Sequence, residues 1–507
     1  MANYYIFKIQ SYQTAFSLCE SGKAIEYHSP EVFHLSSGDS LLGFLEDEKS
    51  SFKYIFNVVS YEDNVLKLEK TLEVVPGYIP LKGSKIFKIL SESQSNIIGI
   101  TKELSDTIKS NMVLDKSSRS ALSKNTLEEQ DFIKFITAIR TKPFLLLAGI
   151  SGTGKSRIVR QLAKSVWPKD SSEHIGQKPS NFEMIQVKPN WHDSSELIGY
   201  VSRIGDKPQF IAGDFLKFIA KAWENPSVPY FLCLDEMNLA PVEQYFAEYL
   251  SVLESRKLQE DGVTIKTDPI LKKVDEEWYL HLVNSITSNE LDSHIKEDFL
   301  THGIRIPQNL IVVGTVNMDE TTYSFSRKVL DRAITIEMNE VNLNGGLHKS
   351  NDIMPYIPAD HFIADAVDGY DVYEQFEDVC KTVLDYLGEV NNQLDNTPFK
   401  IAYRTRNEFL IYVVNALRLT SKEDSDSSEK RNKKIADALD EITTMKILSR
   451  IEGDKRKVYF LEDLKNTIKS KLEEIDGLNR SEEQSVSLAK LKIMEERLRS
   501  GYTSFWD

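Results

Sequence analysis

The octapeptide at residues 149–156, GISGTGKS, is compatible with only a few folds of the surrounding chain. It matches GxxxxGK[ST], it directly follows the apolar run FLLLA at 144–148, and an amphipathic helical pattern follows it. Glycines at these positions let successive backbone N–H groups face a phosphate, and the helix N-terminus adds partial positive charge. A glycine-rich loop that arose by chance is the alternative, and the flanking elements argue against it. The sequence predicts a phosphate-binding loop at the end of a buried strand.

Each side chain of this loop has an expected role in holding a nucleotide. Lys155 is expected to reach the β and γ phosphates, and Ser156 to coordinate Mg²⁺. The other predicted nucleotide-binding residues of the loop are Gly149, Ser151, Gly152, Thr153 and Gly154.

A second apolar run, YFLCL at 230–234, ends in two adjacent acids, Asp235 and Glu236. Open α/β sheets bind ligands at the carboxyl ends of their strands. We therefore expect Asp235 to belong to the Mg²⁺ shell and Glu236 to polarise the attacking water. A helix-capping pair of acids is the alternative for such a dipeptide taken alone. Its position some 80 residues after the loop, at the end of a fully apolar strand, favours the catalytic interpretation.

A third apolar run, LIVVG at 310–314, continues to Asn317 at the expected strand tip. From there its amide can hydrogen-bond the γ-phosphate or the lytic water. Arg327 and Arg332 follow on a helical segment, where a charge-stabilising arginine is expected to project toward a neighbouring subunit. For Arg327 a surface salt bridge is an equally good interpretation.

The pattern around these motifs predicts an α/β architecture. Continuous apolar runs alternate with helical stripes, which suits a five-stranded parallel sheet covered on both faces: 144–148, 183–187, 230–234, 310–314 and 333–337. We expect an α/β nucleotide-hydrolysing domain at 131–345, with a charged, partly helical insertion at about 257–308 that belongs to no sheet element. Residues from about 373 to the end are expected to be mostly helical.

The first 115 residues have a different pattern, with short aromatic and β-branched runs separated by turn residues about every ten positions. They predict a small β-rich domain. The polar stretch at 116–130 has little to bury and is expected to be a linker that leads into a helix.

Charge and cysteine content limit the kinds of partner. Acids outnumber bases 77 to 62 in the 507 residues, for a formal net charge of -15, which excludes a cationic surface that coats nucleic acid. Any DNA contact is expected to be local or made as an oligomer. Cys19, Cys233 and Cys380 lie far apart, give no zinc spacing and fit a reducing cytosol. Neither a leader pattern nor an apolar run approaching a span of about 18 residues is evident, so we expect a cytoplasmic protein without a membrane anchor.

The motifs together resemble the AAA+ superfamily: the phosphate loop, LDEMN at 234–238, the strand-tip Asn317 and LDRA at 330–333. Within it the sequence is similar to the McrB branch, the nucleotide-hydrolysing motor subunits of McrBC-type restriction systems, which include the LlaJI-like enzymes. Four further segments resemble that branch: 188–200 and 238–246 in the core, and 445–454 and 501–506, which resemble its lid motifs. The resemblance implies that residues 346–507 form a helical lid and C-terminal helices. The resemblance covers about residues 130–507.

This resemblance implies a hexameric, Mg²⁺-dependent hydrolase of GTP or ATP with its sites between subunits. GTP is favoured by the family, but the segment after the sensor strand departs from the family's MNxxD followed by Arg-Ser. Val316 stands where Met is usual, and the later Arg-Ser is missing. ATP therefore stays open. In the segment YRTRN at 403–407, the resemblance implies that Arg404 or Arg406 reaches the γ-phosphate, and the other is expected to be a surface charge.

McrB-like motors carry variable N-terminal modules that select DNA. The run GDSLLGF at 38–44 resembles the PUA/EVE/YTH barrels, which hold a flipped modified base in an aromatic pocket. Most aromatic residues of this domain are expected in its core, and no cage residue is assigned.

A separate McrC-like nuclease is the implied partner, because no nuclease constellation is evident in this chain. Two other functions stay open. One is a protein-remodelling AAA+ ATPase of the MoxR or dynein-like kind with a peptide-binding N-domain. The other is a nucleotide-gated binding module that does not hydrolyse.

Overall fold

The computed structural model describes residues 127–506, apart from 169–170, 205, 288–292, 319–322, 340–355 and 420–426. In the first 126 residues it describes the backbone of six strands. The chain divides into two compact units, Met1–Lys124 and Asn125–Asp507.

The first unit contains a six-stranded sheet in the order β2-β5-β4-β3-β1-β6. Its strands are β1 (Tyr4–Ile9), β2 (Ile25–His28), β3 (Ser40–Leu45), β4 (Ser51–Glu62), β5 (Val65–Tyr78) and β6 (Ile97–Ile100). β1 and β3 pair in parallel and the other neighbours are antiparallel. These strands confirm a β-rich unit. A closed barrel stays a prediction, and the apolar run at 85–90 lies outside the described residues.

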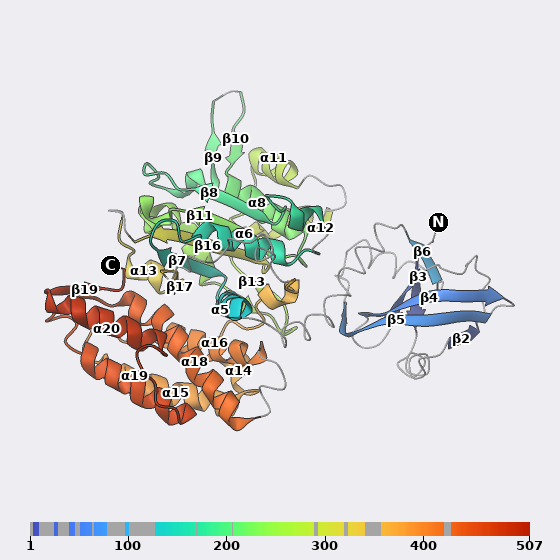
Figure 1. Cartoon of the computed structure of the whole chain (residues 1–507). Coiled ribbons are helices and arrows are strands. Elements are labelled where there is room, and N and C mark those ends of the chain that lie inside the picture. The colour runs from blue at the N-terminus through green and yellow to red at the C-terminus, as the bar shows by residue number, and fades with distance from the viewer. Residues whose placement is uncertain are drawn as a thin grey trace. The chain divides into compact units, whose positions relative to one another are not determined.

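The second unit is built on a five-stranded sheet in the order β17-β7-β16-β11-β8, in which every pair is parallel (Figure 1). The strands are β7 (Phe144–Gly149), β8 (Phe182–Gln186), β11 (Tyr230–Asp235), β16 (Leu310–Asn317) and β17 (Ile334–Glu337). The predicted parallel sheet is confirmed, with each strand within a few residues of its apolar run.

Burial on both faces explains why these strands are continuously apolar. On one face, side chains such as Leu145 and Cys233 pack against α5 (Leu127–Thr141), α6 (Lys155–Ser165) and the lid helices. On the other face, side chains such as Leu146 and Leu232 pack against a second group of helices: α8 (Asp214–Glu224), α10 (Ala247–Leu253), α11 (Glu277–Ile286) and α12 (Ser293–His302). α5 begins at Leu127, inside the segment expected to be a linker.

Two excursions leave the sheet. β9 (Gly199–Ser202) and β10 (Gln209–Ala212) form an antiparallel hairpin that projects at the top of Figure 1. The segment at 257–308 adds α11, α12 and two short ladders, β12 (Lys257–Leu258) with β13 (Ile265–Lys266) and β14 (Pro269–Leu271) with β15 (Ile304–Arg305). The prediction of an insertion without sheet elements was therefore wrong in detail, because these strands are only two or three residues long and leave no periodic pattern.

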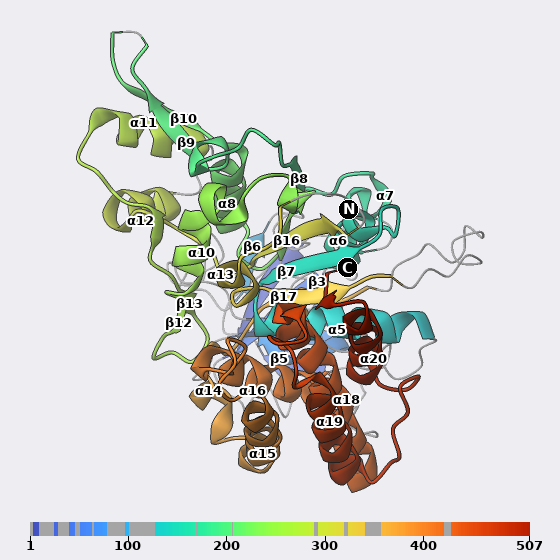
Figure 2. The ribbon, with the colours of Figure 1, turned by 90° about the vertical axis from the view of Figure 1, so that its left-hand side faces the viewer.

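The C-terminal region is helical and gathers below the sheet in Figures 1 and 2. It comprises α14 (Tyr370–Tyr373), α15 (Glu377–Gln393), α16 (Tyr403–Arg418), α18 (Ser428–Lys446), α19 (Leu461–Asp476) and α20 (Val486–Arg499). β18 (Glu452–Asp454) pairs with β19 (Tyr502–Ser504), so the two segments expected as lid motifs lie side by side. The Trp506 indole also donates to the Ser449 carbonyl at 2.9 Å.

The remaining short helices are α7 (Ser172–Ile175), α9 (Val242–Tyr245) and α13 (Arg327–Leu330). Among the described residues, none of the helices combines the length and the apolar character needed to cross a membrane.

Candidate nucleotide-binding site

The predicted phosphate loop joins β7 to α6 with the backbone conformation that its glycines allow. Gly152 and Gly154 have φ of 85° and 82°, in the left-handed region where only glycine avoids a steric cost. At Gly149 a Cβ would lie 2.6 Å from the Met338 carbonyl oxygen, so the continuation of β17 passes directly against the loop. The loop therefore requires glycine for two reasons, its turn and its close neighbour.

Lys155 lies in the first turn of α6 and is 6% exposed. Its Nζ donates to the carbonyl oxygens of Gly149 at 2.9 Å and of Ile150 at 2.7 Å. Both acceptors belong to the loop itself, and neutral carbonyls are weaker partners for an ammonium group than phosphate oxygens. Ser156 follows on the same turn, at the positive end of the helix dipole. The loop, the ammonium group and the helix N-terminus thus converge as a phosphate site requires.

The two acids at the end of β11 are organised by a residue that the sequence analysis missed. The Thr315 hydroxyl donates to Asp235 Oδ1 at 2.7 Å and accepts from the Glu236 backbone N–H at 2.9 Å. Thr315 is 3% exposed and lies on the neighbouring strand β16. Its signal was a polar residue inside an otherwise apolar run, which alone does not identify its partners.

Glu236 adopts an unusual backbone conformation, with φ of 55° and ψ of 49°. For a residue with a Cβ such a conformation costs roughly 1 kcal/mol or more, and it persists only where the surroundings hold it. The Thr315 hydrogen bond is one of the contacts that hold it. The backbone therefore leaves the extended strand conformation directly after Asp235.

Asn317 ends β16 in direct register with Gly149, the first residue of the loop. The next backbone N–H, of Met318, donates to the Gly149 carbonyl at 3.2 Å. β7, β16 and β11 are neighbours in the sheet. The structure therefore gathers five of the predicted residues at one edge of the sheet: Lys155, Ser156, Asp235, Glu236 and Asn317.

Arg332 lies at the opposite edge. It lies two residues before β17, whose Ile334 pairs with Leu145 near the start of β7, whereas the loop follows the end of β7. At about 3.3 Å per strand residue, roughly 15 Å of strand separates Arg332 from the loop edge of its own sheet. Its Nε lies 3.7 Å from Glu254 Oε1.

The other three predicted arginines also lie away from the loop edge or pack within the lid. Arg404 donates to Glu254 Oε2, so it shares a carboxylate with Arg332. Arg406 donates to Asn407 Oδ1 at 2.7 Å and stacks on Tyr403. Arg327 instead donates to the Pro398 carbonyl at 3.2 Å and lies over the ring of Phe399.

A second group of contacts joins the lid to the phosphate loop, and no motif predicted it. Asn339 Oδ1 accepts from the Ile150 backbone N–H at 3.1 Å, and Asn339 Nδ2 donates to Glu337 Oε1 at 2.6 Å. Lys490 of α20 pairs with the same Glu337 oxygen at 2.9 Å. The only sequence signal was an acid at the end of the predicted fifth strand.

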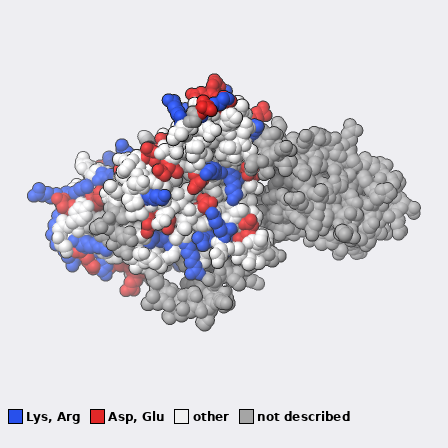
Figure 3. All heavy atoms as spheres, turned by 90° about the horizontal axis from the view of Figure 1, so that it is seen from above, with Lys and Arg blue, Asp and Glu red and all other residues white. Residues whose placement is uncertain are grey.

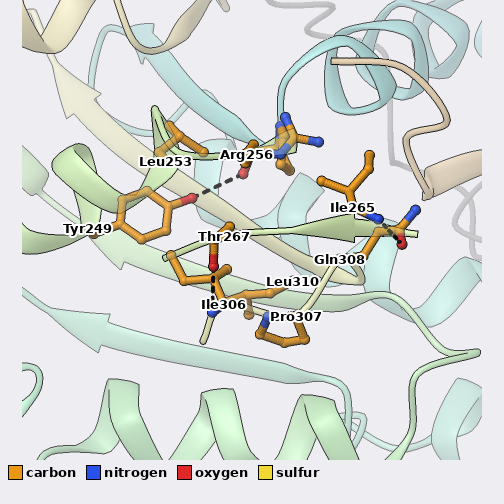
Figure 4. A pocket seen from close by; sticks show the side chains of 10 residues that line it. Tyr249, Leu253, Arg256, Ile265, Thr267, Ile306, Pro307, Gln308 and Leu310 are labelled. Atoms are coloured by element: carbon orange, nitrogen blue, oxygen red, sulfur yellow. Dashed lines mark hydrogen bonds between the residues drawn. The ribbon is translucent and has the colours of Figure 1, made fainter. Parts of the chain in front are cut away.

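A small pocket lies at the edge of the sheet opposite the phosphate loop (Figure 4). Pro143 and Leu310, at the starts of β7 and β16, line it together with Tyr249 and Arg256. Its volume of about 10 Å³ holds about one water molecule, so it cannot be the nucleotide site. Burial lowers the pKa of Arg256 to about 10, which leaves this guanidinium charged near neutral pH.

The part of the chain that carries the candidate site matches a known domain family. Residues 144–335 match the model of the AAA domain (dynein-related subfamily), and residues 360–502 match a domain of unknown function (DUF8727). The chain is 22% identical over 228 residues to the type IV methyl-directed restriction enzyme EcoKMcrB subunit of Escherichia coli (strain K12). That match covers 45% of this chain and 40% of the curated relative, so less than half of either protein is compared.

A solved structure, protein Atu2648 from Agrobacterium tumefaciens, matches 22% of this chain and 93% of its own at 13% identity. Its TM-score of 0.17 is too low to support a structural argument. The phosphate loop, the acids on the neighbouring strand and the five-stranded sheet agree with the family match. The chain is therefore similar to an McrB subunit, and its residues 144–335 form an AAA domain of the dynein-related subfamily, the nucleotide-binding core of a P-loop NTPase.

Proposed function

We propose that this protein is a Mg²⁺-dependent nucleoside triphosphatase that works as a ring, with each site completed by Arg332 of a neighbouring subunit. The observation that carries this proposal is the separation of the predicted residues between opposite edges of one sheet. Stabilising the charge on a transferred γ-phosphate calls for a cation beside it. A second copy can bring its Arg332 edge to the first copy's loop edge. Such a head-to-tail contact closes into a ring, and we expect a hexamer.

The loop-edge residues fit the chemistry of a Mg-nucleotide. The Asp235 carboxylate and the Ser156 hydroxyl are oxygen ligands of the kind that Mg²⁺ prefers, and Thr315 holds one Asp235 oxygen in a set orientation. Mg²⁺ bound there would neutralise charge on the β and γ phosphates. Lys155 binds the same phosphates, while Glu236 orients and polarises the attacking water. Asn317 positions the γ-phosphate or that water.

We propose GTP as the preferred nucleotide, on the resemblance to the McrB branch, with ATP as the alternative. The McrB subunit of Escherichia coli is a subunit of a type IV methyl-directed restriction enzyme. By analogy, the first unit of this protein selects DNA, and a separate McrC-like nuclease cuts it. Basic and acidic side chains are intermixed over the described part of the face in Figure 3, so this part of the face carries no extended basic patch. We expect the protein to act in the cytoplasm.

Hydrolysis and assembly test the central proposal together. Purified protein is incubated with Mg²⁺ and either GTP or ATP, and phosphate release is measured beside the mass of the particle in solution. The expected result is release that depends on Lys155 and rises with protein concentration as rings form. A particle that stays monomeric with saturating nucleotide contradicts the ring.

Protein remodelling is the second candidate, and the hairpin β9–β10 favours it. Tyr200 is 55% exposed and Ile204 is 96% exposed, so apolar side chains project from the domain where a protein substrate could contact them. Binding to modified and unmodified duplex at low salt separates the two functions. A shift of the modified duplex supports the restriction function, and no DNA binding favours remodelling.

A further inference from the structure

One carboxylate, that of Glu254, lies among three cations from different parts of the fold. Glu254 follows α10 directly and its side chain is 25% exposed. It pairs with Arg404 through Oε2, while Arg332 Nε and Lys142 Nζ each lie 3.7 Å from Oε1. Lys142 and Arg332 precede the neighbouring strands β7 and β17, and Arg404 comes from the first turn of lid helix α16. Glu254 therefore joins the core to the lid at the edge opposite the phosphate loop.

The backbone that carries Arg332 is fixed from the lid side as well. Lys446, at the end of α18, is fully buried. Its Nζ donates to three carbonyl oxygens around Arg332, those of Leu330 at 3.3 Å, Asp331 at 3.1 Å and Ala333 at 2.7 Å. With the backbone held, the direction of the Arg332 side chain depends on its own partner, and that partner is Glu254.

The ion pairs that connect through Glu254 and Glu408 carry an excess of positive charge. Four cations share these two carboxylates: Lys142, Arg332, Arg404 and Lys446. The nearby Asp331 is paired with another cation, Arg450, at 3.0 Å. Two partly exposed guanidinium groups of like charge repel each other unless an anion lies between them. Glu254 supplies that anion in the single chain, and the remaining positive charge suits a phosphate brought by a neighbour.

We infer that Glu254 is a positioning residue that holds Arg332 and Arg404 together as one pair, aimed at the terminal phosphate of a nucleotide in the neighbouring subunit. This inference rests on the proposed function, since it requires hydrolysis at a site shared between subunits. It adds that the lid arginine acts beside Arg332 and on the same neighbouring phosphate. Glu254 itself touches neither nucleotide nor water.

The variant Glu254→Gln tests the inference in the full-length assembly. It keeps the size and one acceptor oxygen but removes the charge that keeps the two arginines together. We expect kcat to fall by about tenfold to a hundredfold, because small displacements of a catalytic group have effects of that size. The KM and the affinity for nucleotide are expected to stay close to wild type, since the variant's own phosphate loop is intact.

Mixing subunits distinguishes action on a neighbour from action within one chain. Lys155→Ala subunits lack a working loop but keep both arginines, and Glu254→Gln subunits have the reverse defect. Assemblies of the two are expected to hydrolyse several times faster per intact loop than Glu254→Gln alone, with Arg332→Ala mixed with Lys155→Ala as the positive control. No recovery in the Glu254→Gln mixture, while the Arg332→Ala mixture recovers, overturns the inference.

Two further variants control for charge loss and for folding. Glu377→Gln removes an exposed pair with Lys381, at 2.8 Å on α15, and is expected to keep the wild-type kcat. Glu254→Asp keeps the charge on a shorter side chain and should retain more kcat than Glu254→Gln; equal losses contradict the inference. Suppose that the wild type hydrolyses nucleotide and that Arg332→Ala does not. A fully active Glu254→Gln variant then overturns this inference but leaves the proposed function standing. If wild type neither assembles nor hydrolyses, the proposed function fails first.

Discussion

At the scale of single residues, the hydroxyl of Thr315 connects the two acids of the site. It donates a hydrogen bond to the Asp235 carboxylate and accepts one from the Glu236 backbone N–H, so one side chain orients the proposed metal ligand and helps to hold the positive-φ backbone of the proposed base. A buried hydroxyl with two partners is costly to remove because both partners lose a hydrogen bond.

Thr315→Val should therefore lower the free energy of unfolding by about 1 to 3 kcal/mol and reduce kcat at least about tenfold. Denaturant unfolding and steady-state hydrolysis measure the two effects. Thr335→Val, on strand β17 of the same sheet, is a matched control, because the buried Thr335 hydroxyl has no hydrogen-bond partner within the described structure. Equal losses in the two variants would show that Thr315 acts only through packing.

Glu236→Gln separates binding from hydrolysis. The amide has the shape of the carboxylate but cannot polarise water as a base, so kcat should fall by at least about a hundredfold while nucleotide still binds. A titration with fluorescent nucleotide measures binding, and phosphate release measures hydrolysis. Turnover that survives this substitution would contradict the role assigned to Glu236.

At the scale of secondary-structure elements, lid helix α20 reaches the phosphate loop through the end of β17. Lys490 is 5% exposed and pairs with Glu337, which bonds Asn339, which in turn bonds the loop at Ile150. A movement of the lid is therefore transmitted to the loop by direct contacts. Occupancy of the loop is expected to influence the position of the helix in the same way.

Lys490→Met should both destabilise the second unit and weaken nucleotide binding. Removing one partner of a largely buried pair leaves Glu337 without its cation, at a cost of about 1 to 3 kcal/mol after allowance for the partial exposure of that carboxylate. Thermal unfolding and nucleotide titration measure the two effects. Lys492 lies on the same helix and pairs at the surface with Glu482, which precedes the helix, so Lys492→Met should change little. A variant at 490 that loses stability but binds nucleotide normally would contradict the link to the loop.

At the scale of the whole molecule, the nucleotide chemistry and the proposed DNA selection belong to different compact units. The second unit contains its own sheet, core and lid, and all the predicted nucleotide-site residues. A unit with a complete core is expected to fold without its neighbour.

A chain of residues 125–507 should accordingly hydrolyse nucleotide and lose modified-DNA binding. Phosphate release and duplex gel shifts, both compared with the full chain, provide the measurement. DNA binding that survives in the shortened chain would place DNA recognition in the second unit.

Local patterns in the chain were sufficient for the sheet, the phosphate loop and the acids Asp235 and Glu236. Each depends on neighbours in sequence: a continuous apolar run makes a buried strand, and the glycines and polar residues that follow it emerge at the carboxyl edge. The N-terminal strands were predicted on the same basis. The strands of the insertion are too short to produce a periodic pattern of apolar residues.

The tertiary structure alone decided which arginine lies where. Arg332 and Arg404 are separated by 71 intervening residues, yet they share Glu254, a residue that belongs to no motif. Nothing local to either arginine encodes that contact, because it arises where the lid packs on the starts of β7 and β17. The same holds for the contact of Thr315 with Asp235 and for that of Asn339 with Ile150, because each joins segments that lie far apart in the sequence. Because β17 runs parallel to β7, Arg332 before β17 lies at the edge of the sheet opposite the loop that follows β7. This separation is the physical reason for proposing that one site needs two chains.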